Sequence, residues 1–227
     1  MKKAYNQFVK LLAVIPAFNA DSSLEKLIPA VLGFRHDILV VDDGSRDDTP
    51  NVAIKYKLEL ISHPRNRGKG AALKSGFNYA IENGYEAVIT LDADGQHNPL
   101  DIPRFIESHE NTGADLIIGS RAQSKTGMPP DRRLSNFLTS KILSLFLGMK
   151  IEDSQCGYRL MTTNLLNQVE LKSEQFELES EIIIKAARQG FKIRFIPIKV
   201  RYSLNIKSSM NRLADTLRWI IMLLETI

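Results

Sequence analysis

The chain has 227 residues, of which 44% are hydrophobic and 25% are charged, and its formal net charge is +4 at pH 7. This size and composition are ordinary for a globular protein with a sizeable core. The small positive charge suits an anionic ligand or an anionic membrane surface, and no nucleic-acid partner is expected from it. The single cysteine, Cys156, excludes an internal disulfide and favours a reducing, cytoplasmic compartment.

The first twenty residues begin with lysines and an apolar run, as a signal peptide would. Pro16 and Asn19 interrupt that run, so a first β-strand is the better interpretation. No stretch reaches the roughly eighteen uninterrupted apolar residues that a membrane-spanning helix needs. We therefore expect a cytoplasmic protein that is soluble or lies on the membrane surface.

Short apolar runs alternate with amphipathic helical patterns through the first half of the chain. Strands are predicted at residues 10–17, 37–45, 58–63, 86–94 and 114–121. Helices are predicted at residues 22–34, 47–56, 69–85 and 99–111. In the second of these helices, Thr49 is the expected N-cap and Pro50 the first helical residue. The alternation predicts βαβ units, and hence an α/β fold with a mainly parallel sheet flanked by helices.

The sequence changes in character after Arg121. Residues 122–133 are polar and contain two prolines, which indicates a loop, and residues 152–162 should lead toward another edge of the sheet. Helices are predicted at residues 134–149, 179–190 and 213–227, and a strand pair or one long strand at residues 191–203. Because there is no internal repeat or clear linker, one domain is expected over residues 1–227.

Two carboxylates, Asp92 and Asp94, follow the apolar run of residues 87–91, and Gln96 comes two residues later. In parallel α/β sheets ligands bind outside the carboxyl ends of the strands, so polar side chains there should share one rim. The residues expected at this rim are Asp42, Asp43, Asp92, Asp94 and Arg121. Mg²⁺ and Mn²⁺ prefer oxygen ligands and bridge to phosphates, so Asp92, Asp94 and Gln96 form a candidate metal site. The alternative is that Asp92 caps a turn while Asp94 is solvated.

Two further segments carry polar groups near predicted strand ends. Asp47, Asp48 and Thr49 are interpreted as turn and helix-start residues, whereas Asp43 is expected to accept an N–H of a nucleotide base. Residues 65–76, "RNRGKGAALKSG", lack the phosphate-loop pattern because Gly70 follows Lys69. Their glycines and lysine would either hold an anion at a helix start or simply pack a tight turn.

The histidines show no metal-ligand spacing, and Cys156 has no obvious histidine partner, so a thiol nucleophile is disfavoured. Several basic residues of the second half flank turns, where they could hold phosphate or be ordinary surface charges. These residues are Arg121, Arg132, Arg133, Arg159, Arg201 and Lys207.

Seven motifs, taken together and in this order, resemble family 2 glycosyltransferases: "VIPAFNA", "VVDDGSRDDT", "RNRGKGAALKSGF", "LDADGQHNP", "IGSR", "DSQCGYR" and "FELESEI". Within the family the chain looks most like the polyprenyl-phosphate (dolichyl-phosphate) mannosyl- or glucosyltransferases, from about Leu12 to about Arg218. The resemblance implies a GT-A type nucleotide-sugar-binding fold. It divides the domain into a nucleotide-binding half, residues 10–121, and an acceptor-side half, residues 122–227.

The resemblance also implies an inverting transfer of a hexose from a UDP- or GDP-sugar to a polyprenyl phosphate, assisted by Mg²⁺ or Mn²⁺. The residues implied to bind the nucleotide sugar are Pro16, Phe18, Ala20, Val41, Asp43, Asp92, Ala93, Asp94, Arg121, Arg201 and Lys207. Asp92, Asp94 and Gln96 would be at the metal, and Asp94, Arg121 and Glu181 would be catalytic. The branch often has an acid where this chain has Ala20.

A lipid phosphate is largely ionised at neutral pH, so such an acceptor needs no strong general base. If the acceptor were a sugar hydroxyl, as in polysaccharide or glycolipid assembly, Asp153 or Glu181 should be the base. Glu181 would otherwise be a favourable charge at a helix start. A nucleotide-sugar-binding module without turnover is the third alternative, and the intact set of Asp92, Asp94 and Gln96 argues against it.

Two apolar segments, residues 137–149 and 217–227, carry few charges. They would lie in a membrane interface, pack in the core or form a dimer face. Peripheral membrane contact and a homo-oligomer therefore both stay open on the sequence alone.

Overall fold

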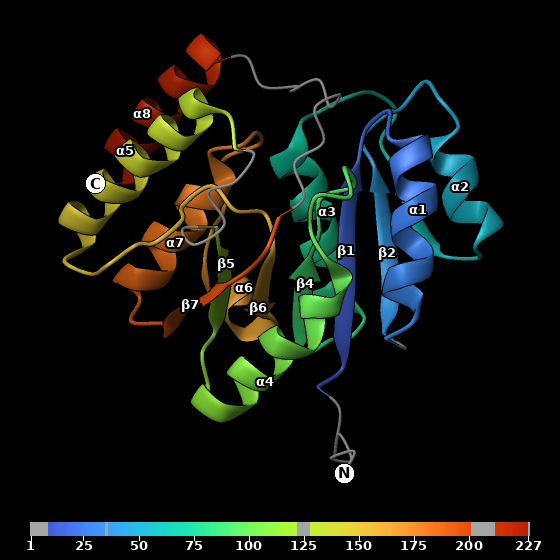
Figure 1. The fold of residues 1–227 in the computed structure, drawn as a ribbon, viewed down its shortest axis with the longest axis horizontal. Helices are drawn as coiled ribbons and strands as arrows, with labels where there is room; N and C mark the ends of the chain where they lie inside the picture. Colours follow the sequence, from blue (N-terminus) through green and yellow to red (C-terminus); the bar gives the residue numbers. More distant parts are fainter. Residues whose placement is uncertain (1–8, 35, 122–127, 201–211, 227) are drawn as a thin grey trace.

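The computed structural model describes residues 9–34, 36–121, 128–200 and 212–226, so the expected ligands Arg201 and Lys207 lie outside the described residues. A seven-stranded sheet runs through it, with the strand order β3-β2-β1-β4-β6-β5-β7 (Figure 1). In chain order the strands are β1 (Leu11–Ala17), β2 (Asp37–Asp42), β3 (Glu59–Ser62), β4 (Ala87–Thr90), β5 (Leu116–Ser120), β6 (Arg159–Thr162) and β7 (Ile193–Pro197).

The sheet is mainly parallel, as predicted. Strands β1 to β4 are parallel to one another where they pair, and β5 is parallel to β7. Strand β6 runs antiparallel to both of its neighbours, β4 and β5. The prediction that residues 152–162 lead to a sheet edge is wrong, because β6 lies inside the sheet with all four residues buried. Hydrophobic runs show that a strand is buried, but they do not show which strands flank it.

Helices lie on both sides of the sheet (Figure 1), which explains why β1, β4, β5 and β6 are buried along their whole length. The helices are α1 (Asp21–Leu32), α2 (Thr49–Lys55), α3 (Lys69–Glu82), α4 (Ile102–Thr112), α5 (Pro130–Leu147), α6 (Thr163–Gln168), α7 (Leu178–Arg188) and α8 (Arg212–Thr226). A short 3₁₀ turn, η1 (Pro99–Asp101), precedes α4. The six-residue α6 was not predicted, since so short a segment shows no clear period.

Two helix starts differ from the prediction. The N-cap of α2 is Asp48, not Thr49, and the Thr49 hydroxyl instead accepts the backbone N–H of Ala20 at 2.8 Å. That hydrogen bond joins the starts of α1 and α2. Helix α5 begins at Pro130, so residues 130–133, predicted as loop, form its first turn. Proline is well tolerated there, because its missing N–H has no helical partner at that position.

Helix α3 packs unusually close to the sheet at Gly76. A Cβ added to Gly76 would lie 2.5 Å from Cγ1 of Val14 on β1, so only glycine fits without a shift. The buried residues one helical turn before and after Gly76, Ala72 and Ala80, are also small. Because its axis is held this close to β1, the first residue of α3, Lys69, is brought to the sheet.

We predict that Gly76→Ala lowers the free energy of unfolding by about 1–3 kcal/mol, since the added methyl overpacks against Val14. Urea denaturation of the purified protein measures the change. Gly33→Ala is the matched control, because a Cβ there meets only the Ala30 carbonyl oxygen at 3.4 Å. Val14→Ala in the Gly76→Ala background should recover part of the loss. Equal stability of the two glycine variants would contradict the packing argument.

Candidate functional site

The two predicted carboxylates lie in a turn that follows β4, at the edge where β1, β2 and β4 have their carboxyl ends. The strand itself ends at Thr90, four residues earlier than predicted, so Asp92 and Asp94 are turn residues. Gly95 takes a left-handed φ of 71°, and the Asp94 carboxylate accepts the backbone N–H of Gln96 at 2.9 Å. The Asp-x-Asp segment thus bends back instead of extending the strand, which keeps both carboxylates near the sheet edge.

A lysine holds the first of these carboxylates. The ammonium nitrogen of Lys69 lies 2.6 Å from Oδ1 of Asp92 and 2.7 Å from Oε1 of Glu179. The three side chains come from α3, the turn after β4 and α7. Gly157 makes room for them, because a Cβ there would lie 2.7 Å from the Asp92 carboxylate and 2.8 Å from the Lys69 nitrogen. This Lys69 cluster (Lys69, Asp92 and Glu179) was not predicted from the sequence.

The two carboxylates of the turn differ in their pKa values. Burial by itself would raise the pKa of Asp92, but the charge of Lys69 lowers it to about 2. For Asp94, burial and then the charge of Asp92 raise the pKa to about 6, although Lys69 and Arg132 act in the opposite direction. Lys69 therefore does not neutralise the pair, and negative charge remains at Asp94.

His97 shapes the same turn as a neutral ring. Burial lowers its pKa to about 4, despite the nearby charge of Asp92. Its Nδ1 accepts the backbone N–H of Asp92 at 3.3 Å, and its ring stacks on Tyr158 with centroids 5.1 Å apart. His97 is thus a structural support of the carboxylate turn.

Arg121, directly after β5, is fixed by a buried carboxylate. Its Nε and Nη2 donate to the two oxygens of Asp153 at 2.7 and 2.8 Å, and its backbone N–H donates to the same carboxylate at 3.0 Å. Burial would raise the pKa of Asp153, but Arg121 holds it below its usual range. Asp153 is fully buried, so it orients Arg121 and is poorly suited to act as a general base.

Asp43 anchors the loop before α3. Its Oδ1 accepts from Nδ1 of His63 at 2.7 Å and from the backbone N–H of Arg67 at 3.0 Å, and its Oδ2 accepts from Gly68 N–H at 2.7 Å. The glycines of residues 65–76 serve close packing: a Cβ at Gly70 would lie 2.6 Å from the backbone carbon of Glu174. Of the two interpretations of this segment, tight packing is the one that the structure favours.

The other nucleotide-binding candidates line the ends of β1 and β2 or lie nearby. Pro16 pairs with Val41 across these strands, and the Val41 side chain is completely buried. Phe18 is 42% exposed at the end of β1, so its ring is accessible to a ligand. Ala93 is buried between the two carboxylates.

Two residues expected at the site have structural partners instead. The Glu181 carboxylate accepts the backbone N–H groups of Lys172 and Ser173, both at 2.9 Å, and pairs with Lys185 at 2.6 Å. Within the described part of the chain, no hydrogen bond or ion pair joins the Glu181 side chain to the Lys69 cluster. The carboxylate of α7 that does reach this cluster is Glu179, two residues earlier.

Arg159, considered above as a phosphate ligand, is 1% exposed and donates to three backbone carbonyls. Its partners are the carbonyl oxygens of Cys156, Glu179 and Ser154, at 2.7, 2.6 and 2.9 Å. It ties the loop before β6 to the start of α7. The "GYR" and "FELESE" segments could have suggested that a buried arginine lies near a glutamate of the second segment. Nothing in their spacing shows which of the glutamates faces inward.

The donor set at the turn fits a divalent cation that is held mainly by its substrate. In the described residues, no group of three or more His, Cys, Asp or Glu side chains is arranged to bind a metal. Mg²⁺ is commonly bound by one or two carboxylates together with substrate phosphates and waters. Asp92, which pairs with Lys69, and Asp94, which forms no ion pair within the described residues, provide two carboxylates for a site of that kind.

Comparison with known proteins places this geometry in context. A family model described as glycosyl transferase family 2 matches residues 12–170. The UDP-N-acetylglucosamine–dolichyl-phosphate N-acetylglucosaminyltransferase of Methanococcus voltae is 30% identical over 84% of this chain and 85% of that protein. The undecaprenyl-phosphate mannosyltransferase of Micrococcus luteus is 30% identical over 84% of this chain and 83% of its own.

A solved structure has the same fold. Glucosyl-3-phosphoglycerate synthase from Mycobacterium tuberculosis, crystallised with Mn²⁺, UDP and phosphoglyceric acid, superposes with a TM-score of 0.77. The alignment covers 95% of this chain and 78% of that one, with 18% sequence identity. The predicted GT-A type fold is therefore confirmed.

We predict that Asp94→Asn stabilises the metal-free protein at neutral pH. Because the folded-state pKa of about 6 exceeds the ordinary 3.8, folded protein binds the Asp94 proton more tightly than unfolded protein. Ionisation then costs stability as pH rises from about 4 to 6, and the cost persists above that range. In EDTA at pH 7.5 the variant should be more stable by on the order of 1–2 kcal/mol, with no gain at pH 4.

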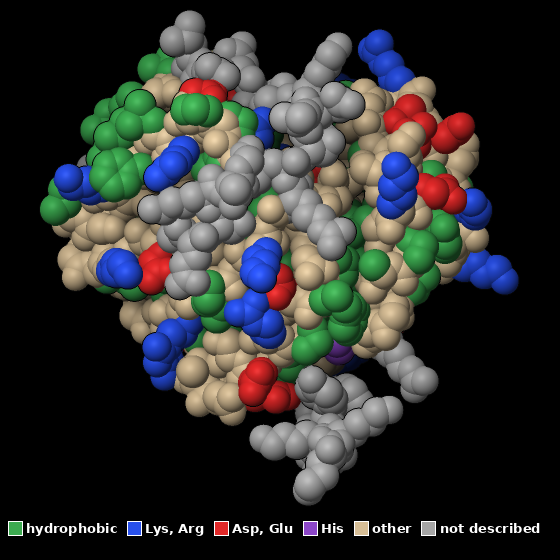
Figure 2. Space-filling model, viewed as in Figure 1, with side chains coloured by type: hydrophobic (Ala, Val, Ile, Leu, Met, Phe, Trp, Pro, Cys, Tyr) green, Lys and Arg blue, Asp and Glu red, His purple; other side chains and the backbone are tan. Residues whose placement is uncertain are grey.

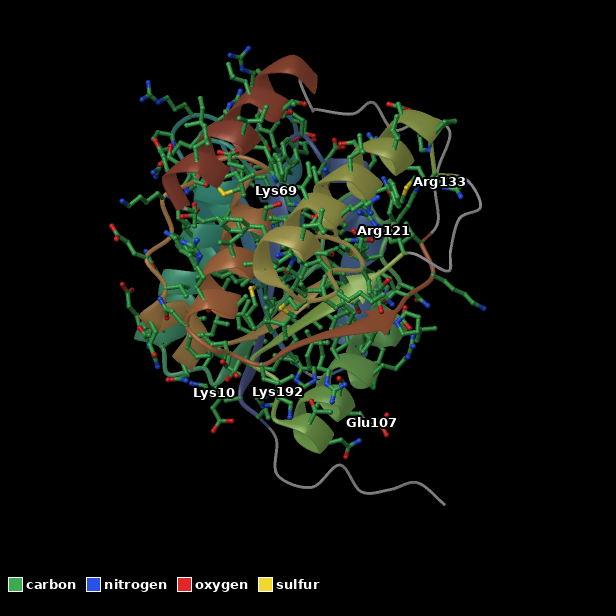
Figure 3. The ribbon with its side chains drawn as sticks, turned by 90° about the vertical axis from the view of Figure 1, so that its left-hand side faces the viewer. Lys10, Lys69, Glu107, Arg121, Arg133 and Lys192 are labelled. Atoms are coloured by element: carbon green, nitrogen blue, oxygen red, sulfur yellow. The ribbon has the colours of Figure 1, made fainter. Side chains whose placement is uncertain are left out.

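Thermal unfolding at both pH values measures this difference. Glu107→Gln is the control, since Glu107 lies on α4 at the opposite end of the molecule from Lys69 and Arg121 (Figure 3). It should behave like the unmodified protein at both pH values. If Asp94→Asn were no more stable than the unmodified protein at pH 7.5, the electrostatic description of the turn would be wrong.

Proposed function

The chain belongs to glycosyl transferase family 2, and we propose that it transfers a hexose from a nucleotide sugar to a polyprenyl phosphate with inversion at the anomeric carbon. One observation carries the proposal: the carboxylates of Asp92 and Asp94, at the carboxyl edge of a GT-A type sheet, lie within electrostatic reach of three cationic side chains. The cations are Lys69, Arg121 and Arg132, and the charge of each acts on Asp92 or Asp94. Such an arrangement suits a diphosphate and its metal ion.

On the donor side, Asp94 and Gln96, next to Asp92, would hold Mg²⁺ or Mn²⁺ against the diphosphate. The bound metal would supply charge neutralisation for the departing nucleoside diphosphate. Lys69 keeps Asp92 ionised and oriented, and Arg121, fixed by Asp153, presents a guanidinium of constant orientation near the same charges. Pro16, at the end of β1, and Phe18 and Ala20, between β1 and α1, would contact the nucleoside.

The acceptor is proposed to be a lipid phosphate for two reasons. Relatives that match more than four fifths of this chain are named for dolichyl-phosphate and undecaprenyl-phosphate acceptors. In addition, Asp153 and Glu181, the two candidate bases for a hydroxyl acceptor, are both engaged in ion pairs. A phosphate acceptor is already ionised and needs neither of them. Its negative charge would be met by Arg121 and Arg132.

The proposal is tested by a radiolabelled transfer assay. UDP-glucose and GDP-mannose are each incubated with undecaprenyl phosphate and Mg²⁺ or Mn²⁺, and label is followed into the organic phase. We expect metal-dependent lipid labelling that EDTA abolishes. Asp94→Ala should reduce the rate by at least about 100-fold, because charge stabilisation of the leaving group is lost.

Glu107→Ala, a carboxylate removed far from the site, is the matched control and should keep full activity. Label that stays in a water-soluble glycan would instead support a hydroxyl acceptor in polysaccharide or glycolipid assembly. Full turnover by Asp94→Ala would contradict the metal assignment.

We further propose that the protein meets its lipid substrate by peripheral contact through α5 and α8. None of the described helices is long and apolar enough to cross a bilayer. These two helices nevertheless expose large hydrophobic side chains: Leu134, Phe137, Leu138, Ile142, Leu145, Leu217, Ile220, Ile221 and Leu224. Figure 2 shows hydrophobic side chains gathered at the upper left, where α5 lies in Figure 1. Lys141 lies beside Phe137, which suits anionic lipid.

Vesicle flotation tests this contact. With vesicles of phosphatidylcholine and phosphatidylglycerol, the unmodified protein should float. The double variant Phe137→Asp/Leu145→Asp should lose at least about tenfold in affinity, since two exposed apolar anchors become charged. Glu107→Ala should float normally. If the unmodified protein does not float, the proposed membrane contact is wrong. The transfer reaction would then still be tested with short-chain acceptors.

A further inference from the structure

Three polar side chains, two of them buried, form a hydrogen-bonded chain beside the proposed nucleotide site. Oδ1 of Asp43 lies 2.7 Å from Nδ1 of His63, and Nε2 of His63 lies 2.9 Å from the Ser75 hydroxyl. The residues come from the end of β2, the end of β3 and helix α3. The side chains of His63 and Asp43 are only 6% and 4% exposed. The reaction proposed above uses neither His63 nor Ser75.

The direction of these hydrogen bonds follows from the chemistry of the groups. A carboxylate only accepts, so the proton between His63 and Asp43 is on Nδ1 of the histidine. When the ring is neutral, Nε2 has a lone pair and accepts the hydroxyl proton of Ser75. Ser75 therefore holds the ring in the orientation that donates to Asp43.

This geometry limits how many hydrogen bonds Asp43 still accepts. A carboxylate offers about four lone-pair sites, two on each oxygen. Oδ1 already accepts from His63 and from the backbone N–H of Arg67, and Oδ2 accepts from Gly68. One site is left, on Oδ2.

We infer that the donor is a uridine nucleotide and that His63 is the positioning residue that sets this specificity. Uracil presents one ring N–H, which one remaining lone pair satisfies. Guanine presents N1–H and the 2-amino group side by side, and these require two acceptors. With Oδ1 filled by His63 and Arg67, guanine keeps a desolvated donor without a partner, and such a donor weakens binding. The inference rests on the proposed function, because it takes Asp43 as the contact for the base.

Isothermal titration of the full chain with UDP and with GDP, each with Mn²⁺, tests this inference. The two ligands have the same diphosphate, so contacts with metal and arginine cancel in the comparison. UDP should bind at least about tenfold more tightly than GDP. In His63→Ala, Oδ1 loses one donor and regains an acceptor site, so the ratio of the GDP to the UDP dissociation constant should fall by at least about threefold.

Two further variants separate this role from general loss of structure. His63→Asn keeps an N–H donor at the position of Nδ1 and should restore the ratio toward that of the unmodified protein. Ser75→Ala leaves the Asp43–His63 hydrogen bond in place and should keep most of the discrimination. Circular dichroism establishes that each variant is folded before its ratio is compared.

The possible failures are distinguishable. If GDP binds as tightly as UDP or more tightly, the inference is overturned while the proposed transfer reaction stands. If UDP is preferred but His63→Ala leaves the ratio unchanged, the role of His63 is overturned. Binding of neither nucleotide would instead overturn the proposed function.

Discussion

The ion pairs of a single ammonium group, that of Lys69, hold the segments of the candidate site together. Lys69 lies between Asp92 and Glu179, and so it joins the start of α3, the turn after β4 and the start of α7. Charges this poorly exposed are costly to leave unpaired, so each partner constrains the other two. The contact needs a helix that approaches the sheet at Gly76 and a loop without a side chain at Gly157. Gly76 and Gly157, which are far apart in the sequence, thus both make room for the ion pairs of Lys69.

Some carboxylates of the site already have protein partners and hold the structure together, whereas others are available to a ligand. Asp153 and Glu181 are bonded to cations and backbone N–H groups, and Asp43 to His63 and two backbone N–H groups. Asp94 differs, since its pKa is raised to about 6 by burial and by the charge of Asp92. Because the fold does not stabilise the ionised form of Asp94, a bound cation would stabilise it instead. Metal and diphosphate binding would therefore relieve a cost that the free protein carries.

Most of the fold was predictable from the sequence, because βαβ alternation and buried strands leave strong periodic signals. The expected rim of Asp42, Asp43, Asp92, Asp94 and Arg121 followed from one rule about strand ends. The ion-pair partners of the site residues were not predictable. "FELESE" contains three glutamates, and only the rotation of α7 decides that Glu179, not Glu181, pairs with Lys69. The burial of Arg159 was missed for the same reason, since an arginine that binds carbonyls and one that binds phosphate look alike in a sequence.

The position of β6 has a consequence for how the chain reaches this structure. Among the described strands, β6 alone links β4 and β5 in the sheet, yet residues 91–158 separate it from β4 along the chain. During synthesis, β1 to β4 can pair as a parallel unit, but one edge of β4 has no native partner until residue 162 has emerged. An unpaired edge of apolar residues invites association with other chains. A fragment that ends before β6 therefore cannot form the sheet as one piece, even if it contains β1 to β5 in full.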